Sequence, residues 1–167
     1  GRDGASVVDL NGDGRNDLVT AGIHDSGTGT SGVIYVLLDP RNLESRVDLN
    51  DLGDTIPGFT LLTPGIPGTL ADAGDFDGDG FHDLLINASP ASGLGSFFLF
   101  YGNGNLEGTY SLAALSTDGS GAQRFLPPAN PEDSERLSFG GSKNAVGVGD
   151  VNNDGLDDIL IGESYGG

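Results

Sequence analysis

Residues 9–17 read DLNGDGRND, residues 75–83 read DFDGDGFHD, and residues 150–158 read DVNNDGLDD. The three stretches share Asp at positions 1, 5 and 9, Asn or Asp at position 3, and Gly at position 6. Each is followed directly by an apolar run, which reads LVTAG, LLINA or ILIGE. Their first residues are separated by 66 and then by 75 positions. A motif that recurs at such a period indicates a repeat architecture, in which each unit is one supersecondary structure.

The residues around each loop predict short β-strands. A strand-like run comes before each loop, at residues 5–8, 70–74 and 145–149. After the apolar run, a Gly- and Ser-rich turn leads to a further strand, GVIYVLL at 32–38 and GSFFLFYG at 95–102. A fourth strand is expected at 59–62 and at 123–126. The unit is therefore strand, acidic loop, strand, turn, strand, irregular stretch, strand, which is the size of a propeller blade with long loops.

The composition favours many short strands over long helices. Gly accounts for 30 of the 167 residues, and each Gly inside a helix costs roughly 1 kcal/mol relative to Ala. The polar connections at 39–57 and 103–122 show no clear pattern, so we expect irregular surface excursions there. The chain carries 25 acidic residues against 7 Lys and Arg, a formal charge of −18. Because nucleic acids and anionic membranes bind clusters of Lys and Arg, neither is an expected partner.

Two further features of the composition bound the class of protein. The sequence has no Cys and no apolar stretch of membrane-spanning length, so we expect neither a disulfide framework nor membrane insertion. It also has no Met, even at position 1. We therefore expect a processed or excised piece of a longer protein.

The acidic loops have the donor pattern that calcium prefers. Calcium takes six to eight oxygen ligands at about 2.3–2.6 Å. Side chains at positions 1, 3, 5 and 9 and the carbonyl at position 7 would supply them, and Gly at position 6 permits a positive φ. The predicted ligands are Asp9, Asn11, Asp13, Asp17 and the Arg15 carbonyl in the first loop, Asp75, Asp77, Asp79, Asp83 and the Phe81 carbonyl in the second, and Asp150, Asn152, Asp154, Asp158 and the Leu156 carbonyl in the third. Because these carboxylates would repel one another without a divalent ion, we predict three Ca²⁺ sites.

Other interpretations of the loops fit less well. Turns rich in Asp, Asn and Gly also occur without a metal, but three copies with one spacing and a following strand are poorly explained as ordinary turns. An EF-hand needs a bidentate Glu at position 12 and a helix after the loop, whereas this chain has Thr20, Ile86 and Ile161 there, within strand-like runs. Magnesium is less favoured because it keeps several of its waters.

The repeats resemble the FG-GAP repeat of integrin α-chain propellers and of their bacterial relatives. DVNNDGLDDILIGES at 150–164 and DFDGDGFHDLLINASP at 75–90 are similar to the family pattern DVNGDGxxDLLIGAP, and Phe139 and Gly140 stand where the FG element belongs. The resemblance implies a seven-bladed propeller with calcium loops on one face and ligand loops on the other. We therefore predict an all-β fold, a partial β-propeller of about two and a half four-stranded antiparallel blades with calcium-binding hairpin loops. The expected units are residues 1–66, residues 67–138 and, as the first half of a third blade, residues 139–167.

The resemblance also implies a function, an extracellular or cell-surface module for adhesion, interaction or assembly, in which calcium is structural. The expected partner is a protein or glycan of the cell surface or matrix, with self-assembly or the remainder of a longer chain as alternatives. No enzymatic activity is expected: residues 162–166 match the G-x-S-x-G nucleophile motif, but Ser164 stands at the GAP position of the third repeat, and that motif needs a following helix.

Two other functions stay open at this point, a carbohydrate-binding (lectin-like) propeller and a non-catalytic propeller segment of a larger secreted enzyme. Sugar pockets usually present aromatic platforms. The chain has no Trp, and its candidate platforms are Tyr35, Tyr101, Tyr110 and Tyr165.

Overall fold

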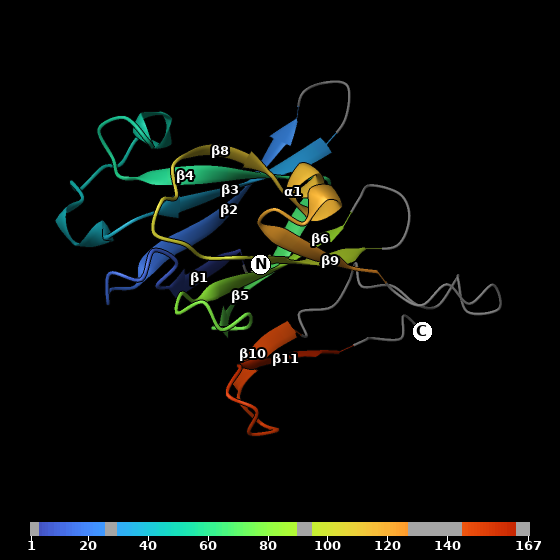
Figure 1. Cartoon of the computed structure of the whole chain (residues 1–167). Helices are drawn as coiled ribbons and strands as arrows, with labels where there is room; N and C mark the ends of the chain where they lie inside the picture. The colour runs from blue at the N-terminus through green and yellow to red at the C-terminus, as the bar shows by residue number, and fades with distance from the viewer. Residues whose placement is uncertain (1–3, 26–29, 90–94, 127–144, 163–167) are drawn as a thin grey trace.

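The computed structural model describes residues 4–25, 30–89, 95–126 and 145–162, and Figure 1 shows their arrangement. Strands dominate these residues, so the predicted all-β class is confirmed. The strands are β1 (Ala5–Val8), β2 (Asp17–Asp25), β3 (Thr30–Leu37), β4 (Gly58–Thr63), β5 (Ile66–Gly74), β6 (Asp83–Ser89), β7 (Ser96–Phe100), β8 (Gly108–Ser111), β9 (Ala122–Phe125), β10 (Ala145–Gly149) and β11 (Asp158–Ile161). The helices are η1 (Pro40–Asn42), η2 (Leu49–Asp51) and α1 (Leu112–Asp118). None of the helices in the described ranges is long and apolar enough to cross a membrane.

The described strands form three sheets, whose first strands β1, β5 and β10 follow one another along the chain. The first sheet has the order β1-β2-β3-β4-β8, the second β5-β6-β7-β9, and the third is the hairpin β10-β11. Neighbouring strands are antiparallel except for β4 and β8, which are parallel. In Figure 1 the second sheet lies between the first sheet and the β10-β11 hairpin. The antiparallel sheets predicted from the hairpin signals are therefore present.

The order of strands within the first two sheets follows the predicted unit. An acidic loop joins the first two strands of each sheet, and a third and a fourth strand then add on one side. Strand β5 begins at Ile66, well before the predicted start at Leu70. The pairing of β5 with β6 is irregular between Pro67 and Leu70. Across this irregular stretch the side chains do not alternate regularly between the two faces of the sheet. The alternation of apolar and polar residues therefore does not predict the first part of β5.

The connection at 103–122 is not the irregular excursion that the sequence predicts, and this part of the prediction is wrong. It contains β8, which runs parallel to β4 with Phe59 opposite Gly108 and Leu62 opposite Ser111. It also contains α1, where the Ser111 hydroxyl accepts the N–H of Ala114 at the start and Gly119 adopts a left-handed φ of 71° at the end. A segment of the second unit thus adds a fifth strand to the first sheet.

The first core lies between the first and second sheets. It contains buried side chains of β2, β3 and β4 on one side and of β5, β6 and β7 on the other. Three rings from different strands meet there: the centroid of Phe59 lies 5.7 Å from that of Phe100 and 5.6 Å from that of Tyr110. The ring centroids of Phe100 and Tyr110 are 5.8 Å apart. Such tilted and edge-to-face pairs add to the burial of apolar area that holds the two sheets together.

A second core lies on the opposite face of the second sheet. Leu85, Phe97 and Leu99 of that sheet pack there with Ala145 of β10, and Ile159 and Ile161 of β11 contact the same cluster. Strands β6 and β7 are therefore buried on both faces. This double burial is the reason that their sequences, DLLINAS and SFFLF, are nearly continuous apolar runs rather than alternating ones.

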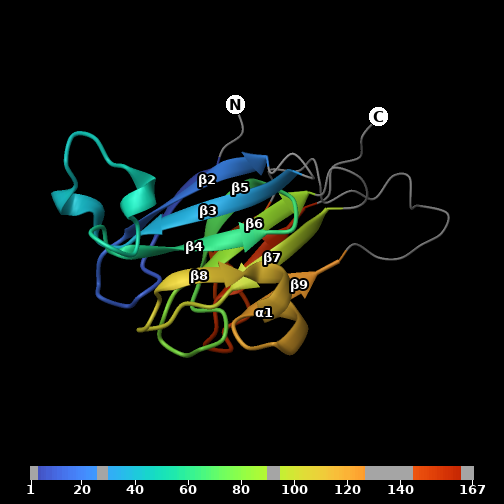
Figure 2. The same ribbon diagram turned by 90° about the horizontal axis from the view of Figure 1, so that it is seen from above.

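The three acidic loops lie along the same side of the molecule. They connect β1 to β2, β5 to β6, and β10 to β11. Figures 1 and 2, two views at right angles, both place these loops at the same edge of the stacked sheets. The loops are thus neighbours in space although 66 and 75 residues separate their first residues.

Candidate metal sites

Each acidic loop is closed by a hydrogen bond between its first and sixth positions. The amide of Gly14 donates to Asp9 Oδ2 at 2.8 Å, that of Gly80 to Asp75 Oδ2 at 3.0 Å, and that of Gly155 to Asp150 Oδ2 at 2.9 Å. These glycines have φ values of 79°, 94° and 94°. Side chains with a Cβ adopt such angles at a cost, so Gly at position 6 is required by the turn itself.

The aspartate at position 9 lies beneath the loop and links it to the sheet. Asp17 and Asp83 are both 0% exposed. Asp83 Oδ2 accepts the amide of Phe76 in the loop, and Asp83 Oδ1 accepts the amide of Gly102 just after β7, each at 3.0 Å. In the first loop, Asp17 accepts the amides of Leu10 and Asp39 at 3.0 and 3.2 Å. Each buried carboxylate therefore ties its loop to the end of the third strand of the sheet.

The third loop repeats the first half of this arrangement. Asp158 Oδ2 accepts the amide of Val151 at 3.0 Å, which corresponds to the Phe76 and Leu10 bonds in the other loops. Asp154 and Asp150 are linked in turn, because the Asp154 amide donates to Asp150 Oδ1 at 3.1 Å. All three loops thus share the bond from position 2 to position 9 and the bond from position 6 to position 1, whereas the bond from position 5 to position 1 occurs in the first and third loops.

Burial raises the pKa of Asp17 and of Asp83 well above the ordinary value of 3.8. The pKa of Asp17 is about 6 and that of Asp83 is about 7. In both cases the accepted amide hydrogen bonds lower the pKa in part, whereas the acidic neighbours at other loop positions raise it further. Partial burial and the nearby Asp79 also raise the pKa of Asp77. The loops thus concentrate negative charge that a cation would neutralise.

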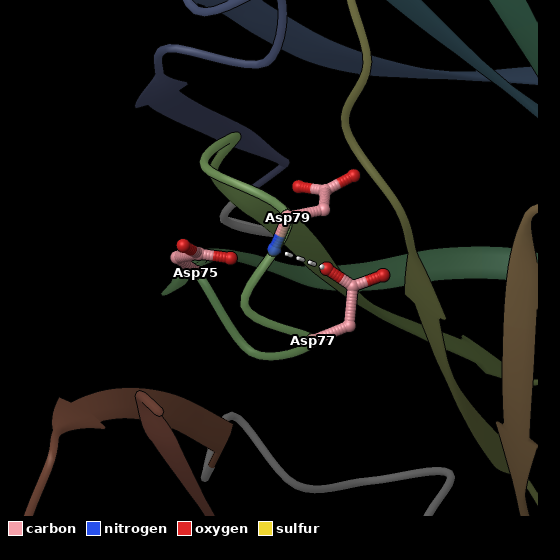
Figure 3. A group of neighbouring side chains, drawn as sticks. All are labelled: Asp75, Asp77 and Asp79. Carbon is pink, nitrogen blue, oxygen red and sulfur yellow. Dashed lines mark hydrogen bonds between the residues drawn. The ribbon is translucent and has the colours of Figure 1, made fainter. Parts of the chain in front are cut away.

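The second loop gathers three carboxylates that fit one metal ion. One oxygen from each of Asp75, Asp77 and Asp79 lies within 4.8 Å of the others (Figure 3). Two ligands on opposite sides of a calcium ion are at most about 5 Å apart, because each lies at about 2.3–2.6 Å. The donors are all oxygens, the ligand type that calcium takes. The spacing and the chemistry of the group therefore suit calcium.

Asp75 supplies an independent sign that a ligand belongs in this loop. Its Oδ1 atom is buried and has no hydrogen-bond partner among the described residues, whereas its Oδ2 accepts the amide of Gly80. A buried carboxylate oxygen without a partner costs free energy, unless a cation or another donor satisfies it. This atom identifies the second loop as the site that the structure prepares most fully.

The other predicted ligands occupy the corresponding places in their loops. In the first loop, the Asp13 amide donates to Asp9 Oδ1 and to Asn11 Oδ1, each at 3.1 Å. In the third, Asn152 Nδ2 donates to Asp154 Oδ2 at 3.0 Å. Among the described residues, the grouping of three acidic ligand atoms occurs only at Asp75, Asp77 and Asp79. The first and third sites, and the carbonyls of Arg15, Phe81 and Leu156, stay predictions.

Sequence reasoning missed Asp39, which belongs to the surroundings of the first loop. Asp39 adopts a left-handed φ of 48° directly before η1. Its carboxylate accepts hydrogen bonds from Arg41 Nε at 2.6 Å and from Arg15 Nη1 at 3.2 Å, and the Arg41 guanidinium lowers the pKa of Asp39. Position 7 of the first loop is thereby paired with a residue that follows β3. No local motif links Asp39 to the first loop, because its partners there, Arg15 and Asp17, lie 24 and 22 positions before it.

Two comparisons with known proteins agree with the loop pattern. Residues 67–105, which contain the second acidic loop, match the model of the family described as FG-GAP repeat. Integrin alpha-6 of Gallus gallus is 26% identical over 125 residues, which are 72% of this chain and 11% of that protein. Integrin alpha-4 of Xenopus laevis is 28% identical over 166 residues, 95% of this chain and 14% of that protein. The chain thus spans a small part of the length of each relative, and the predicted resemblance is confirmed.

Proposed function

We propose that this chain, which contains an FG-GAP repeat and is related to integrin α-chains, is a calcium-stabilised interaction module of the extracellular space or cell surface. The observation that carries the proposal is the second loop, where the buried and unpartnered Asp75 Oδ1 lies in a group of three carboxylates. That loop lies within the segment that matches the FG-GAP family. Three bound Ca²⁺ ions, one in each acidic loop, are part of the proposal.

In this function calcium has a structural role. An ion held by positions 1, 3 and 5 would fix the outer part of the loop, while the buried aspartate at position 9 already holds its base. Binding of an ion to the folded state alone stabilises it by RT ln(1 + [L]/Kd), which is about 2.7 kcal/mol at a free concentration one hundred times Kd. Each ion would therefore strengthen one hairpin of a sheet whose core is small.

We propose further that each sheet, without the added strand β8 in the case of the first, corresponds to one blade of a propeller. The units would be residues 1–66, 67–138 and 139–167, each with its acidic loop at the same edge (Figure 2). The stacking of the second sheet between two apolar cores supports this assignment. In a propeller, loops at the edge opposite to the calcium loops are free to contact a partner. The proposed partner is a protein or glycan of the cell surface or matrix.

A carbohydrate-binding function has less support. Tyr110 is not available as a platform, because its ring packs on Phe59 and its hydroxyl accepts the amide of Glu107 at 3.2 Å. A cavity of about 540 Å³ beside η1 and η2 has no aromatic lining. Its lining residues are Leu38, Asp39, Leu43, Glu44, Arg46, Val47, Asp48, Asp51, Thr55, Ile56 and Pro57. Sugar sites usually stack a ring against an aromatic side chain.

The experiment that tests the proposal is a calcium titration followed by NMR at the amides of Gly14, Gly80 and Gly155. Each of these amides donates to the position 1 aspartate of its loop, so each should shift when its own loop binds an ion. We expect three saturable transitions, and magnesium at the same concentration should bind more weakly.

Two matched variants make this titration specific. Asp79→Ala should abolish the transition of Gly80 and leave that of Gly14 in place. Asp54→Ala removes the same charge at an exposed position outside the loops and should change neither. Absence of saturable shifts in the wild-type chain would overturn the proposed calcium function, as would an Asp79→Ala variant that titrates like the wild type.

A further inference from the structure

Neighbouring acidic loops contact one another through a pair of equivalent positions. A Cβ placed on Gly12 would lie 2.7 Å from the ring of Phe81, and one on Gly78 would lie 2.7 Å from Leu156 Cδ2. In both cases position 7 of one loop packs on the glycine at position 4 of the loop before it. These glycines also have positive φ values of 70° and 77°. The same contact thus occurs at both junctions, and the three loops form a continuous row.

The second and third loops share an additional polar link through Asp157, which is position 8 of the third loop. The amide of Asp75 donates to Asp157 Oδ2 at 2.9 Å, and the amide of Asp157 donates to the carbonyl of Asp75 at 3.1 Å. Gly74, with a φ of 71°, makes room for this carboxylate, because a Cβ there would overlap it. Asp157 therefore holds both the amide and the carbonyl of the first residue of the second loop.

Among the described contacts, position 8 has no such role in the other two loops. It is Asn16 in the first loop and His82 in the second. His82 Nδ1 pairs with Asp72 Oδ1 at 3.0 Å, within its own sheet. The first loop is linked instead to the segment after β7, because the amide of Asn103 donates to the carbonyl of Leu10 at 3.0 Å. The contact made by Asp157 is thus a property of this junction and not of the repeat motif.

We propose that Asp157 is a positioning residue for the second calcium site, and that it makes calcium binding at the second and third loops cooperative. The inference rests on the proposed function. Asp157 lies between Leu156 and Asp158, two of the predicted ligands of the third site. Its carboxylate accepts the amide of Asp75, a member of the three-carboxylate group of the second site whose Oδ1 is buried without a partner. One residue therefore connects the ligand sets of two ions.

The coupling follows from the order that each ion imposes. An ion in the third loop fixes residues 156–158, and with them the carboxylate that holds the Asp75 amide. The second ion then binds a ligand whose conformation is already restricted, so less entropy is lost. Because coupling between two binding sites is reciprocal, the second ion must strengthen the third site by the same factor. Such factors lie typically between about 5 and 150, and we expect about tenfold here.

The test reads the two sites separately in one NMR titration, with Gly80 reporting on the second site and Gly155 on the third. Asp154→Ala removes a predicted ligand of the third site. In the wild-type background this change should move the calcium midpoint at Gly80 to about tenfold higher concentration, which corresponds to about 1.4 kcal/mol. In an Asp157→Ala background, adding Asp154→Ala should leave the Gly80 midpoint at the value of the Asp157→Ala variant alone.

Three control variants isolate the contact itself. Asp157→Asn keeps an oxygen that can accept the Asp75 amide, so the coupling should persist. Asp157→Glu keeps the charge but displaces the carboxylate by one methylene, so the coupling should be lost. This variant tests the contact in case Asp157→Ala unfolds the third hairpin. Asn16→Ala changes position 8 of the first loop and should have no effect at Gly80.

The outcomes separate this inference from the proposed function. If neither glycine amide shifts with calcium, the proposed function fails. If both sites bind and Asp154→Ala leaves the Gly80 midpoint unchanged, cooperativity is refuted. A midpoint that moves equally with and without Asp157 would show that the coupling runs through another contact and would overturn the role of this residue. The reciprocal experiment, in which Asp79→Ala empties the second site, must move the Gly155 midpoint by the same factor.

Discussion

Asp83 and Asp79 belong to the same acidic loop, but the structure gives them different tasks that one pair of substitutions can separate. Asp83 is fully buried and accepts the amides of Phe76 and Gly102. Asp79 is exposed and accepts only the amide of Phe81, at 2.9 Å, among the described contacts. We predict that Asp83→Ala destabilises the chain strongly with or without calcium, whereas Asp79→Ala destabilises it strongly only when calcium is present.

The magnitudes follow from the contacts. Asp83→Ala leaves two amides without an acceptor in a buried environment, at about 1–3 kcal/mol each. Burial raises the pKa of the Asp83 carboxyl to about 7, because a buried charge is unfavourable. Removing this carboxyl therefore offsets part of the stability that is lost with the two hydrogen bonds. We therefore expect Asp83→Ala to lower the free energy of unfolding by about 2–4 kcal/mol in chelator. Asp79→Ala should cost about 0.5 kcal/mol there, and about 2.7 kcal/mol more at calcium one hundred times Kd.

The assay is urea unfolding of the wild type and both variants, in excess EGTA and again at saturating calcium, followed by far-ultraviolet circular dichroism and by Tyr fluorescence. Agreement of the two probes is needed, because the free energies assume two-state unfolding. An Asp83→Ala variant as stable as the wild type in EGTA would refute the structural role of position 9. Equal losses for Asp79→Ala in EGTA and in calcium would show that this side chain holds no ion.

Three further predictions concern the metal, a glycine and the pH. Chelation of calcium should lower the melting temperature of the wild type, and an unchanged thermal unfolding curve would remove the structural role of the ions. Gly78→Ala should cost about 1–2 kcal/mol in urea unfolding, because φ is +77° and Leu156 is in the way, whereas Gly104→Ala, where only an ordinary 3.7 Å contact to Phe81 would form, should be neutral. In EGTA, the free energy of unfolding should fall as the pH rises from about 4 to about 7. In the folded chain Asp17 and Asp83 have pKa values of about 6 and about 7, whereas the ordinary value is 3.8. The folded chain therefore binds more protons than the unfolded chain in this range, and raising the pH favours unfolding. Urea unfolding across this range would contradict the reasoning if stability rose instead.

The parts of the structure that the sequence predicts are those with local causes. Asp75, Gly80 and Asp83 close a turn whose hydrogen bonds join residues five and seven positions apart, so the motif alone predicts the loop. The strands that follow each loop are also predictable. Strands β6 and β7 are apolar throughout because both of their faces are buried, and such short runs between turn signals are typical of central strands.

The parts that the sequence could not predict depend on distant partners. Strand β8 reads GTYS, with no apolar pattern, and three of its four residues are exposed. It becomes a strand because β4, about fifty residues earlier, offers a free edge. Asp157 is equally hidden, because its partner Asp75 lies 82 positions before it. Propensity scales and turn motifs use only residues that are close in the sequence. They therefore cannot predict the pairing of β4 with β8 or of Asp75 with Asp157.

The parallel pairing of β4 with β8 means that the boundary between two repeats is not a boundary for folding. During synthesis β4 is complete at Thr63, but its outer neighbour emerges only with Gly108–Ser111. In a fragment that ended between the first two units, the outer edge of β4 would be unpaired. Unpaired strand edges promote association with other chains. The ring cluster of Phe59, Phe100 and Tyr110 would also lose two of its members. The first sheet is therefore complete only together with the segment that carries β8, so a protein engineer who shuffles these modules should not cut between the first two sheets.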